Sequence, residues 1–213
     1  TGTANINLTN NTISDMVATT WFYTLGAIGI GTNNNNIAPV QMTITGNTIY
    51  NSAYAGVDID YIDGINITQN SIYNTPEGIN IRNNGNDDLE RQDGDTPEII
   101  SSVNIGGSNY NVTFQVPTFC SNCDIEFFTN EENDMPFNGR TYVQTETSLA
   151  AGTYTRTINS GGNNTGFWTA TLNDHSQNSS VSQFSDKYPI NPKGPGDVSQ
   201  NIKLWLRADN GVT

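Results

Sequence analysis

The chain has 213 residues and a formal net charge of −13, with 8 lysines and arginines against 21 acidic residues. This charge argues against nucleic acid and anionic membranes as partners, because both bind proteins through cationic contacts to phosphate groups. No stretch of the sequence approaches the roughly 18 consecutive apolar residues of a membrane-spanning helix. At this length the natural expectation is two domains.

A six-residue pattern, Leu/Ile-Thr-x-Asn-Thr/Ser-Ile, begins at Leu8, Ile44 and Ile67. The last two copies are 23 residues apart, and the motif GVDI at residues 56–59 recurs as GINI at residues 78–81. The first copy contains two insertions, near residues 18–25 and 33–39. A short fixed period with alternating apolar residues predicts stacked coils of three short strands. The alternation places Ile, Leu, Val and Met inside and Thr, Asn and Asp outside.

Stacked coils place equivalent side chains above one another. Asn11, Asn47 and Asn70 occupy the same position in the three copies. We expect them to form an internal ladder, in which each side-chain amide bonds to the next one and to turn backbone. Tyr50 and Tyr73 should stack in the same manner. The isoleucines two residues after each asparagine should point into the core: Ile13, Ile49 and Ile72.

These repeats resemble the right-handed parallel β-helix of the pectate-lyase-like superfamily. The resemblance covers residues 1–86 and implies an all-β fold in which they form the C-terminal coils of a parallel β-helix. Natural solenoids cover their open ends with a cap. We therefore expect the chain to be an internal piece of a longer protein with further coils upstream; a short self-capped solenoid is the alternative.

A second domain is expected after an acidic, glycine-bearing tract at residues 87–97, which is typical of a linker. Short runs with strand composition then alternate with turn clusters, which predicts an immunoglobulin-like β-sandwich over residues 98–190. The seven expected strands lie near residues 98–104, 110–116, 124–129, 141–147, 153–158, 166–172 and 180–184. The expected core residues are Phe114, Ile125, Phe127, Tyr154, Phe167, Trp168 and Leu172.

The order of these modules resembles large secreted or cell-surface proteins of Bacteroidota. In those proteins a solenoid precedes a small β domain that ends in a Gly-Asn-Thr-Ser-Glu-Phe-Ser-like strand. Residues 191–213 consist of a linker followed by the run LWLRADNGV. This run resembles the first strand of a concanavalin A-like lectin/glucanase domain. The resemblance implies type IX secretion and an extracellular or cell-surface location. Matches to the strand ending are Asn178, Ser180, Gln183, Phe184 and Ser185, whereas Ser179 and Val181 depart from it.

Asp58 and Asp60 are the best candidates for catalysis. They lie on one strand face that should point outward, roughly 7 Å apart, and paired carboxylates at such distances occur in glycosidases. Stacking also places Asn80 over Asp58 and Arg82 over Asp60, which predicts a surface ladder with an Asp60–Arg82 ion pair. The coils contain no His or Lys to act as a base beside them. We favour the ladder over catalysis, and calcium binding at this pair is the remaining alternative.

Calcium is the one cofactor considered, and the acidic tract offers a second weak site for it. Its acids do not follow the spacing of an EF-hand loop, so a solvated linker is favoured. Cys120 and Cys123 follow a proline and precede a strand, which favours a local disulfide over a zinc or thioredoxin-like site. His175 lies in a turn-like stretch and is interpreted as a surface residue. The acids of the tract are Asp87, Asp88, Glu90, Asp93 and Asp95.

Three functions remain open at this point. The favoured one is a non-enzymatic structural or adhesive segment of a large secreted or cell-surface protein, a stalk and spacer for binding domains. The second is part of a β-helix polysaccharide lyase or glycoside hydrolase with its cleft upstream. The third is a subunit of an extracellular filament assembled by strand complementation. The expected partners are further domains of the same chain, carbohydrate or another surface protein, and other copies through edge strands.

Overall fold

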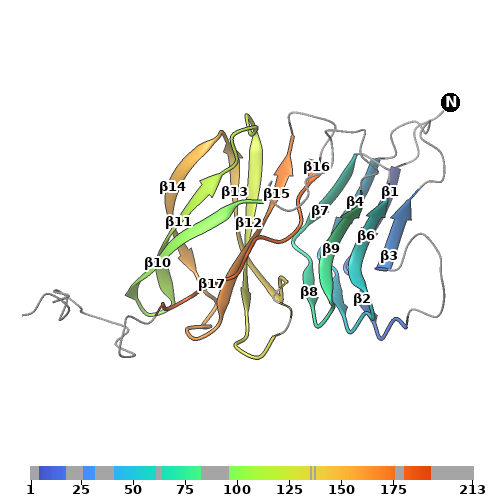
Figure 1. Ribbon diagram of the computed structural model, residues 1–213, viewed down its shortest axis with the longest axis horizontal. Helices are drawn as coiled ribbons and strands as arrows, with labels where there is room; N and C mark the ends of the chain where they lie inside the picture. The colour runs from blue at the N-terminus through green and yellow to red at the C-terminus, as the bar shows by residue number, and fades with distance from the viewer. Residues whose placement is uncertain are drawn as a thin grey trace, which may run out of the picture.

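The structure is a computed structural model that describes residues 5–17, 26–31, 41–60, 64–82, 96–134, 136, 138–175 and 180–192. These residues form an all-β protein without a helix. No helix long and apolar enough to cross a membrane is therefore found in this part of the chain. Figure 1 shows two regions beside each other. We call residues 5–82 the coil region and residues 96–192 the two-sheet region.

The coil region consists of three circuits of the chain, each with one strand in each of three parallel sheets, β1-β4-β7, β2-β5-β8 and β3-β6-β9. We call each circuit a coil. The first coil contains β1 (Asn5–Thr9), β2 (Thr12–Ser14) and β3 (Gly26–Gly31). The second contains β4 (Gln41–Thr45), β5 (Thr48–Tyr50) and β6 (Ala55–Asp60). The third contains β7 (Ile65–Thr68), β8 (Ser71–Tyr73) and β9 (Glu77–Arg82).

The register of the coils follows the repeat in the sequence. Ile44 pairs with Leu8 on one side and with Ile67 on the other. Ile49 and Ile72 are fully buried in the common core, as expected. Ile13, the equivalent residue of the first coil, is only partly buried against that core. The corners between strands use one residue in the left-handed conformation, such as Gly46 with φ of 66° and Asn51 with φ of 56°, which Gly and Asn tolerate best.

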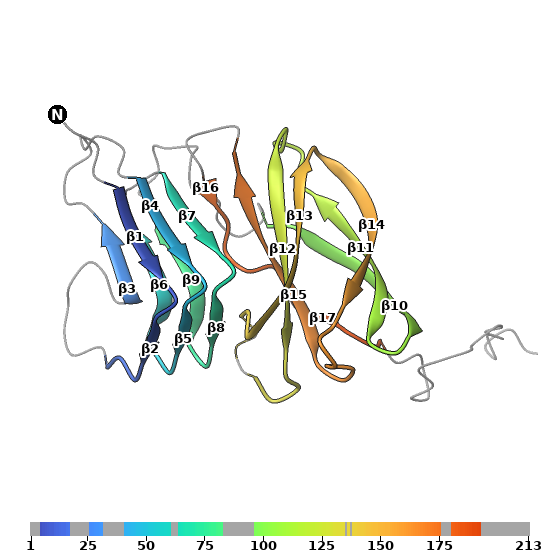
Figure 2. The ribbon, with the colours of Figure 1, turned by 180° about the vertical axis from the view of Figure 1, so that it is seen from behind.

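The two-sheet region consists of antiparallel strands in two sheets, β10-β11-β14 and β13-β12-β15-β16, with β17 paired to β15. Figure 2 shows the two sheets from behind. The first sheet contains β10 (Glu98–Gly106), β11 (Asn109–Val116) and β14 (Gly152–Asn159). The second contains β12 (Cys123–Asn130), β13 (Thr141–Leu149), β15 (Phe167–Asp174), β16 (Ser180–Val181) and β17 (Tyr188–Pro189).

Side chains of both sheets share one core, in which Phe114, Ile125, Phe127, Trp168 and Leu172 are fully buried. These five residues were expected there. Tyr154 packs against the core only in part. Phe167 is wrong as a core residue, because successive residues of a strand face opposite sides. Its neighbour Trp168 takes the inward position, while Lys187 Nζ lies 5.0 Å from the Phe167 ring centroid.

The strands expected near residues 98–172 correspond to β10 through β15. The seventh expected strand, 180–184, is reduced to the two residues of β16, and β17 was not anticipated. Nearly all of the expected linker 87–97 lies outside the described residues, as do residues 193–213 with the lectin-like run.

Candidate functional site

The third coil lies directly against the two-sheet region. Strands β15 and β16 stand next to β7 in both ribbon views (Figures 1 and 2). Ile72 of β8 forms an antiparallel bridge with Gly139, with N–H···O distances of 2.8 and 2.9 Å in the two directions. We call this contact the joint. The residues of the two-sheet region that contribute to it are Glu126, Asn138, Gly139, Arg140, Asn173, Val181 and Phe184.

Apolar side chains of the joint close the end of the coil core. Val181 of β16 is buried within the coil cluster rather than within the core of its own sheets, and Phe184 packs against the same cluster. A Cβ atom added to Gly78 or Gly139 would clash with the Phe184 ring, so both positions need glycine for this close approach. Val181 and Phe184 therefore act as a cap on the third coil, which stacked repeats require.

Polar groups of the joint bond to the backbone of the third coil. Asn138 Nδ2 donates to the Thr75 carbonyl oxygen at 2.9 Å and to Thr75 Oγ1 at 3.0 Å. Asn173 Nδ2 donates to the Ile67 carbonyl oxygen at 3.2 Å. A following coil would otherwise supply such partners, and a buried backbone group without one destabilises the fold. Side chains of the two-sheet region thus replace a neighbouring coil.

Glu126 is the one strongly perturbed acid of the joint. Its side chain is 2% exposed, and its Oε2 accepts the Gln69 backbone N–H at 2.8 Å while Oε1 accepts from Thr145 Oγ1 at 3.4 Å. Burial disfavours the charged carboxylate and raises the pKa of Glu126 to about 7, helped by the negative charge of Asp124 and opposed by the two hydrogen bonds. The contact between the two regions therefore contains a group that exchanges a proton near neutral pH.

Arg140 fixes the outer side of the joint. Its guanidinium lies over the Tyr73 ring at 4.1 Å from the centroid. Its Nε donates to Asp134 Oδ2 at 2.6 Å, and this bond is the main reason that the pKa of Arg140 is raised. The arginine thus joins β8 of the third coil to a turn of the two-sheet region.

The predicted asparagine ladder is present in the hydrogen bonds of the coils. Asn47 Nδ2 donates to Asn70 Oδ1 at 2.9 Å, and Asn11 Nδ2 donates to Asn47 Oδ1 at 3.1 Å. Asn70 Nδ2 donates to the carbonyl oxygen of Ile44 at 2.8 Å. Asn47 and Asn70 are buried, whereas Asn11 is exposed.

Asp58 and Asp60 lie on β6 in register with Asn80 and Arg82 of β9. The expectation that both acids are exposed is wrong, because their side chains are 0% and 4% exposed. Asp58 Oδ1 instead accepts a hydrogen bond from Asn80 Nδ2 at 2.8 Å, a partner that a buried carboxylate needs. The repeat pattern specifies which residues stack, but not what covers the outer face of a sheet.

In the described part of the chain no group of three or more His, Cys, Asp or Glu side chains is arranged so that it could hold a metal ion. The weak calcium candidates of the acidic tract fall outside the described residues. They are Asp87, Asp88, Asp93 and Asp95.

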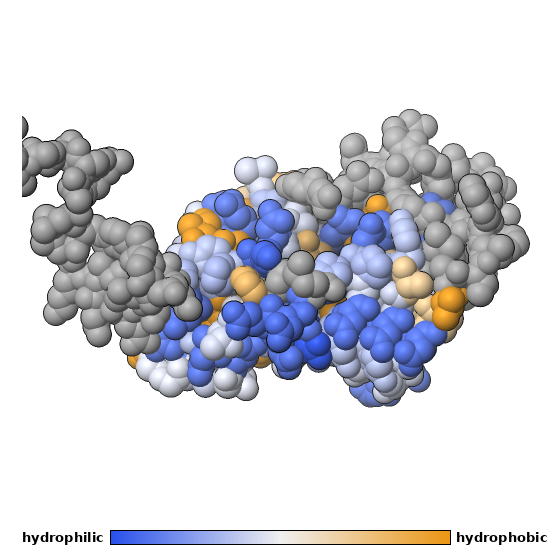
Figure 3. Space-filling model, turned by 60° about the horizontal axis from the view of Figure 1, so that its bottom comes forward, coloured by the Kyte–Doolittle hydropathy of each residue, from blue (hydrophilic) through white to orange (hydrophobic). Residues whose placement is uncertain are grey.

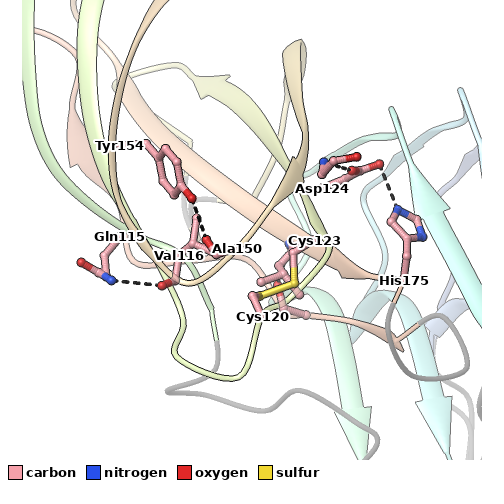
Figure 4. Close-up of a disulfide and its surroundings, with 11 residues drawn as sticks. Gln115, Val116, Cys120, Cys123, Asp124, Ala150, Tyr154 and His175 are labelled. Atoms are coloured by element: carbon pink, nitrogen blue, oxygen red, sulfur yellow. Dashed lines mark hydrogen bonds and ion pairs between the residues drawn. A yellow bond between two sulfur atoms is a disulfide. The ribbon is translucent and has the colours of Figure 1, made fainter.

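Cys120 and Cys123 form a disulfide at the start of β12, and both sulfurs belong to the core of the two-sheet region (Figure 4). His175 Nε2 lies 2.9 Å from Asp124 Oδ2 beside them. The histidine side chain is partly exposed. This pair ties the end of β15 to β12.

Comparison with known proteins gives little further information. No protein family and no curated protein matches the sequence. One similar solved structure is the chitinase ChiW of a Paenibacillus species, described as a bacterial cell-surface-expressed multi-modular enzyme machinery. It is 12% identical, the match covers 89% of this chain and 19% of that chain, and the TM-score is 0.29. A TM-score this low carries no argument about the fold or the activity of the present chain.

Proposed function

We propose that this chain is a non-enzymatic structural and adhesive segment of a large secreted or cell-surface protein, where it serves as a stalk and spacer for binding domains. In this proposal residues 1–86 are the C-terminal coils of a right-handed parallel β-helix, and residues 98–190 are an immunoglobulin-like β-sandwich. The partners are further domains of the same protein, and the location is extracellular.

The joint is the observation that supports this proposal most directly. Val181 and Phe184 fill the open end of the coil core, while Asn138 and Asn173 bond to the backbone of the third coil. Two modules on a flexible tether need no such contacts. A stalk does need them, because it keeps a distal domain at a fixed place only if each module is held rigidly against the next.

The surroundings of the acids favour the stalk over the enzyme. A general acid or base must reach the atom that it protonates. Asp58 and Asp60 are buried, and Asp58 is bonded to Asn80. The coil sequence, residues 1–86, also contains no His or Lys that could act as a second acid or base beside them.

Small-angle scattering of the full chain tests the stalk. We expect the data to fit a single rigid arrangement of the two regions, and the double variant Asn138→Ala/Phe184→Ala to show a larger radius of gyration and a distribution of shapes. Asn159→Ala, a change at an exposed asparagine of β14, is the control and should scatter like the unmodified protein. Unmodified protein that requires a flexible ensemble would contradict the proposal.

Two further measurements address the location and the chemistry. Antibodies against the chain should label intact cells of the source organism, and labelling only after lysis would refute a surface role. The chain should release no sugar from neutral or acidic polysaccharides. Turnover that disappears in Asp58→Ala or Asp60→Ala would favour the enzyme instead.

A filament subunit is the second candidate, and strand β10 supports it. This strand is an edge of its sheet, and Ile100, Val103 and Ile105 on it are 43%, 58% and 51% exposed. An edge strand with apolar side chains is a site where another strand can pair. Analytical ultracentrifugation should then show concentration-dependent association that Val103→Lys abolishes, whereas a monomer at all concentrations would exclude the filament.

A further inference from the structure

A column of side chains runs along the outer face of sheet β2-β5-β8. Ser14, Tyr50 and Tyr73 are in register in the three coils. The two tyrosine rings are stacked, with centroids 5.2 Å apart and an angle of 7° between the ring planes. Arg140 covers the other face of Tyr73, at 4.1 Å from its centroid. Tyr73 therefore has a neighbour on each of its two faces.

Tyr50 differs, because among the described residues it stacks with one ring only, that of Tyr73. The register places Ser14 at the next position of the column, and a hydroxymethyl group is too small to cover an aromatic ring. Neighbouring strands lie about 4.8 Å apart. A flat group of the thickness of a ring can therefore lie against Tyr50 at the level of Ser14. Among the described residues the column thus ends in a slot with an aromatic wall.

Polar groups surround this slot. Asp15 is fully exposed and accepts a hydrogen bond from Asn51 Nδ2 at 3.1 Å. That bond, followed by one from Ser14, lowers the pKa of Asp15 and keeps the carboxylate charged at neutral pH. Thr12 is exposed on the same strand face as Ser14, two residues earlier. Figure 3 brings this side of the coils forward and shows mainly hydrophilic residues over them.

We propose that this slot, made of Tyr50, Ser14, Asp15, Asn51 and Thr12, is a subsite for one pyranose ring of a neutral glycan. The face of an aromatic ring carries partial negative charge, and the C–H bonds on one side of a pyranose are weakly positive, so the sugar packs flat on Tyr50. Its hydroxyl groups then donate to the Asp15 carboxylate, since charge-assisted hydrogen bonds are the stronger ones.

The charge of the chain narrows the classes of ligand that the slot can bind. Asp15 and the net charge of −13 repel uronic acids, sulfated sugars and nucleic acid. A purely apolar ligand would form no hydrogen bond with the exposed Asp15 carboxylate or with the Thr12 hydroxyl. The slot lies on a different sheet from Asp58 and Asp60, so it is independent of any chemistry at those acids and of the stiffness of the joint.

The plainer alternative is that the two tyrosines only stabilise the stack of coils. Saturation-transfer NMR on the full chain separates the two, with cellohexaose, xylohexaose, mannohexaose and chitohexaose as neutral probes and a hexamer of galacturonic acid as the acidic probe. We expect transfer to the C–H protons of at least one neutral probe and none to the acidic one. No transfer to any neutral probe would overturn the proposal.

Ser14→Tyr is the decisive variant, because it continues the tyrosine column and fills the slot while Tyr50 stays in place. We expect it to abolish transfer. Thr9→Tyr, the same kind of change at an exposed position on the neighbouring sheet of the same coil, is the matched control and should bind as the unmodified chain does. Transfer that persists in Ser14→Tyr would place the sugar elsewhere and refute the slot.

Asp15→Asn provides a second variant that does not depend on how well a new ring packs in the first coil. It keeps the size of the side chain and removes the charge, so affinity for the neutral probe should fall at least fivefold. Tyr50→Phe retains the ring face and should bind within twofold of the unmodified chain. Equal affinity in Asp15→Asn would contradict the assigned role of the carboxylate, and circular dichroism of each variant verifies that the coils are intact.

Discussion

The two ends of the coil stack carry the same sequence pattern but differ in what covers them. Ile6, Met42 and Ile65 occupy one position in the three coils. Ile6 is 46% exposed, Met42 is partly buried and Ile65 is 2% exposed. The exposure of this side chain thus falls from the first coil to the third, which packs against the two-sheet region. Burial in this region is therefore a property of the stack, not of the individual coil.

This difference shows what the two-sheet region contributes. Beyond the third coil it supplies Val181 and Phe184 to the coil core and a backbone bridge to Ile72. The same isoleucine position in the first coil, Ile13, remains partly exposed. A change at the covered end should thus cost more stability than the same change at the other end.

The largest expected effect is that of Ile72→Ala. Ile72 is fully buried, and removing such a side chain leaves a cavity, which typically costs about 4 kcal/mol. Ile13→Ala, the matched change in the first coil, should cost about 1 kcal/mol because its surroundings are partly exposed. Urea denaturation of both variants measures the two losses in free energy of unfolding, provided that the dependence of this free energy on urea concentration is the same in both. Equal losses would mean that the two ends are equally covered.

The second effect is the pH dependence that Glu126 gives to the joint. Folding raises the pKa of Glu126 from 4.5 to about 7, so the folded state favours the protonated acid. The stabilisation of the folded state by protonated Glu126 is fully present below pH 4.5, declines as the pH rises, and is lost above about pH 7. The total change is roughly 3 kcal/mol, given 1.36 kcal/mol for each unit of pKa.

Glu126→Gln is the variant that checks this dependence. The amide oxygen can still accept the Gln69 N–H, so the variant should match the unmodified chain at pH 4.5 and exceed it in stability at pH 8. Glu98→Gln, at an exposed residue of β10, changes the net charge equally and serves as the control. A difference between Glu126→Gln and the unmodified chain that is constant from pH 4.5 to pH 8 would contradict the role of burial.

The coils could be predicted from the sequence because their information is local and repeated. The spacing of Ile44 and Ile67, and of Asn47 and Asn70, corresponds directly to the register of the parallel sheets. The burial of Asp58 could not be predicted in this way. It depends on what lies over the outer face of β6, and the repeat period contains no information on that.

The joint was missed for a related reason. Ile125 and Phe127 face the core of the two sheets, so strand alternation places Glu126 and Phe128 on the opposite side, for which no neighbour was predicted. Phe128 on that side was a signal that another layer covers it. Phe184 gave a second signal, but it was assigned to the last strand of the sandwich and not to the coil core, which begins far away in the sequence.

The third effect compares two rungs of the asparagine ladder. Asn70→Ala should cost about 2 kcal/mol, because the buried groups that bond to Asn70, including the carbonyl oxygen of Ile44, lose their partner. Asn11→Ala should cost less than about 1 kcal/mol, since the side chain is exposed and water can replace it. Thermal melting of both variants measures the ratio of the two losses of stability. A stability unchanged in Asn70→Ala would show that the ladder does not support the stack.

The smallest expected effect concerns the two-sheet region, which carries a covalent link that the coils lack. Cys120 and Cys123 enclose a very short loop, and the loss of chain entropy on closing such a loop is small, so reduction should cost less than about 2 kcal/mol. The Cys120 carbonyl oxygen also accepts the Ala151 N–H at 2.8 Å, a bond that reduction leaves in place. Intact mass should rise by two hydrogens on reduction, and the double variant Cys120→Ser/Cys123→Ser should remain folded. A mass that does not change on reduction would exclude the disulfide. A loss of stability on reduction that is larger than the loss in Ile72→Ala would show that the crosslink, rather than the packing at the joint, dominates the stability of the chain.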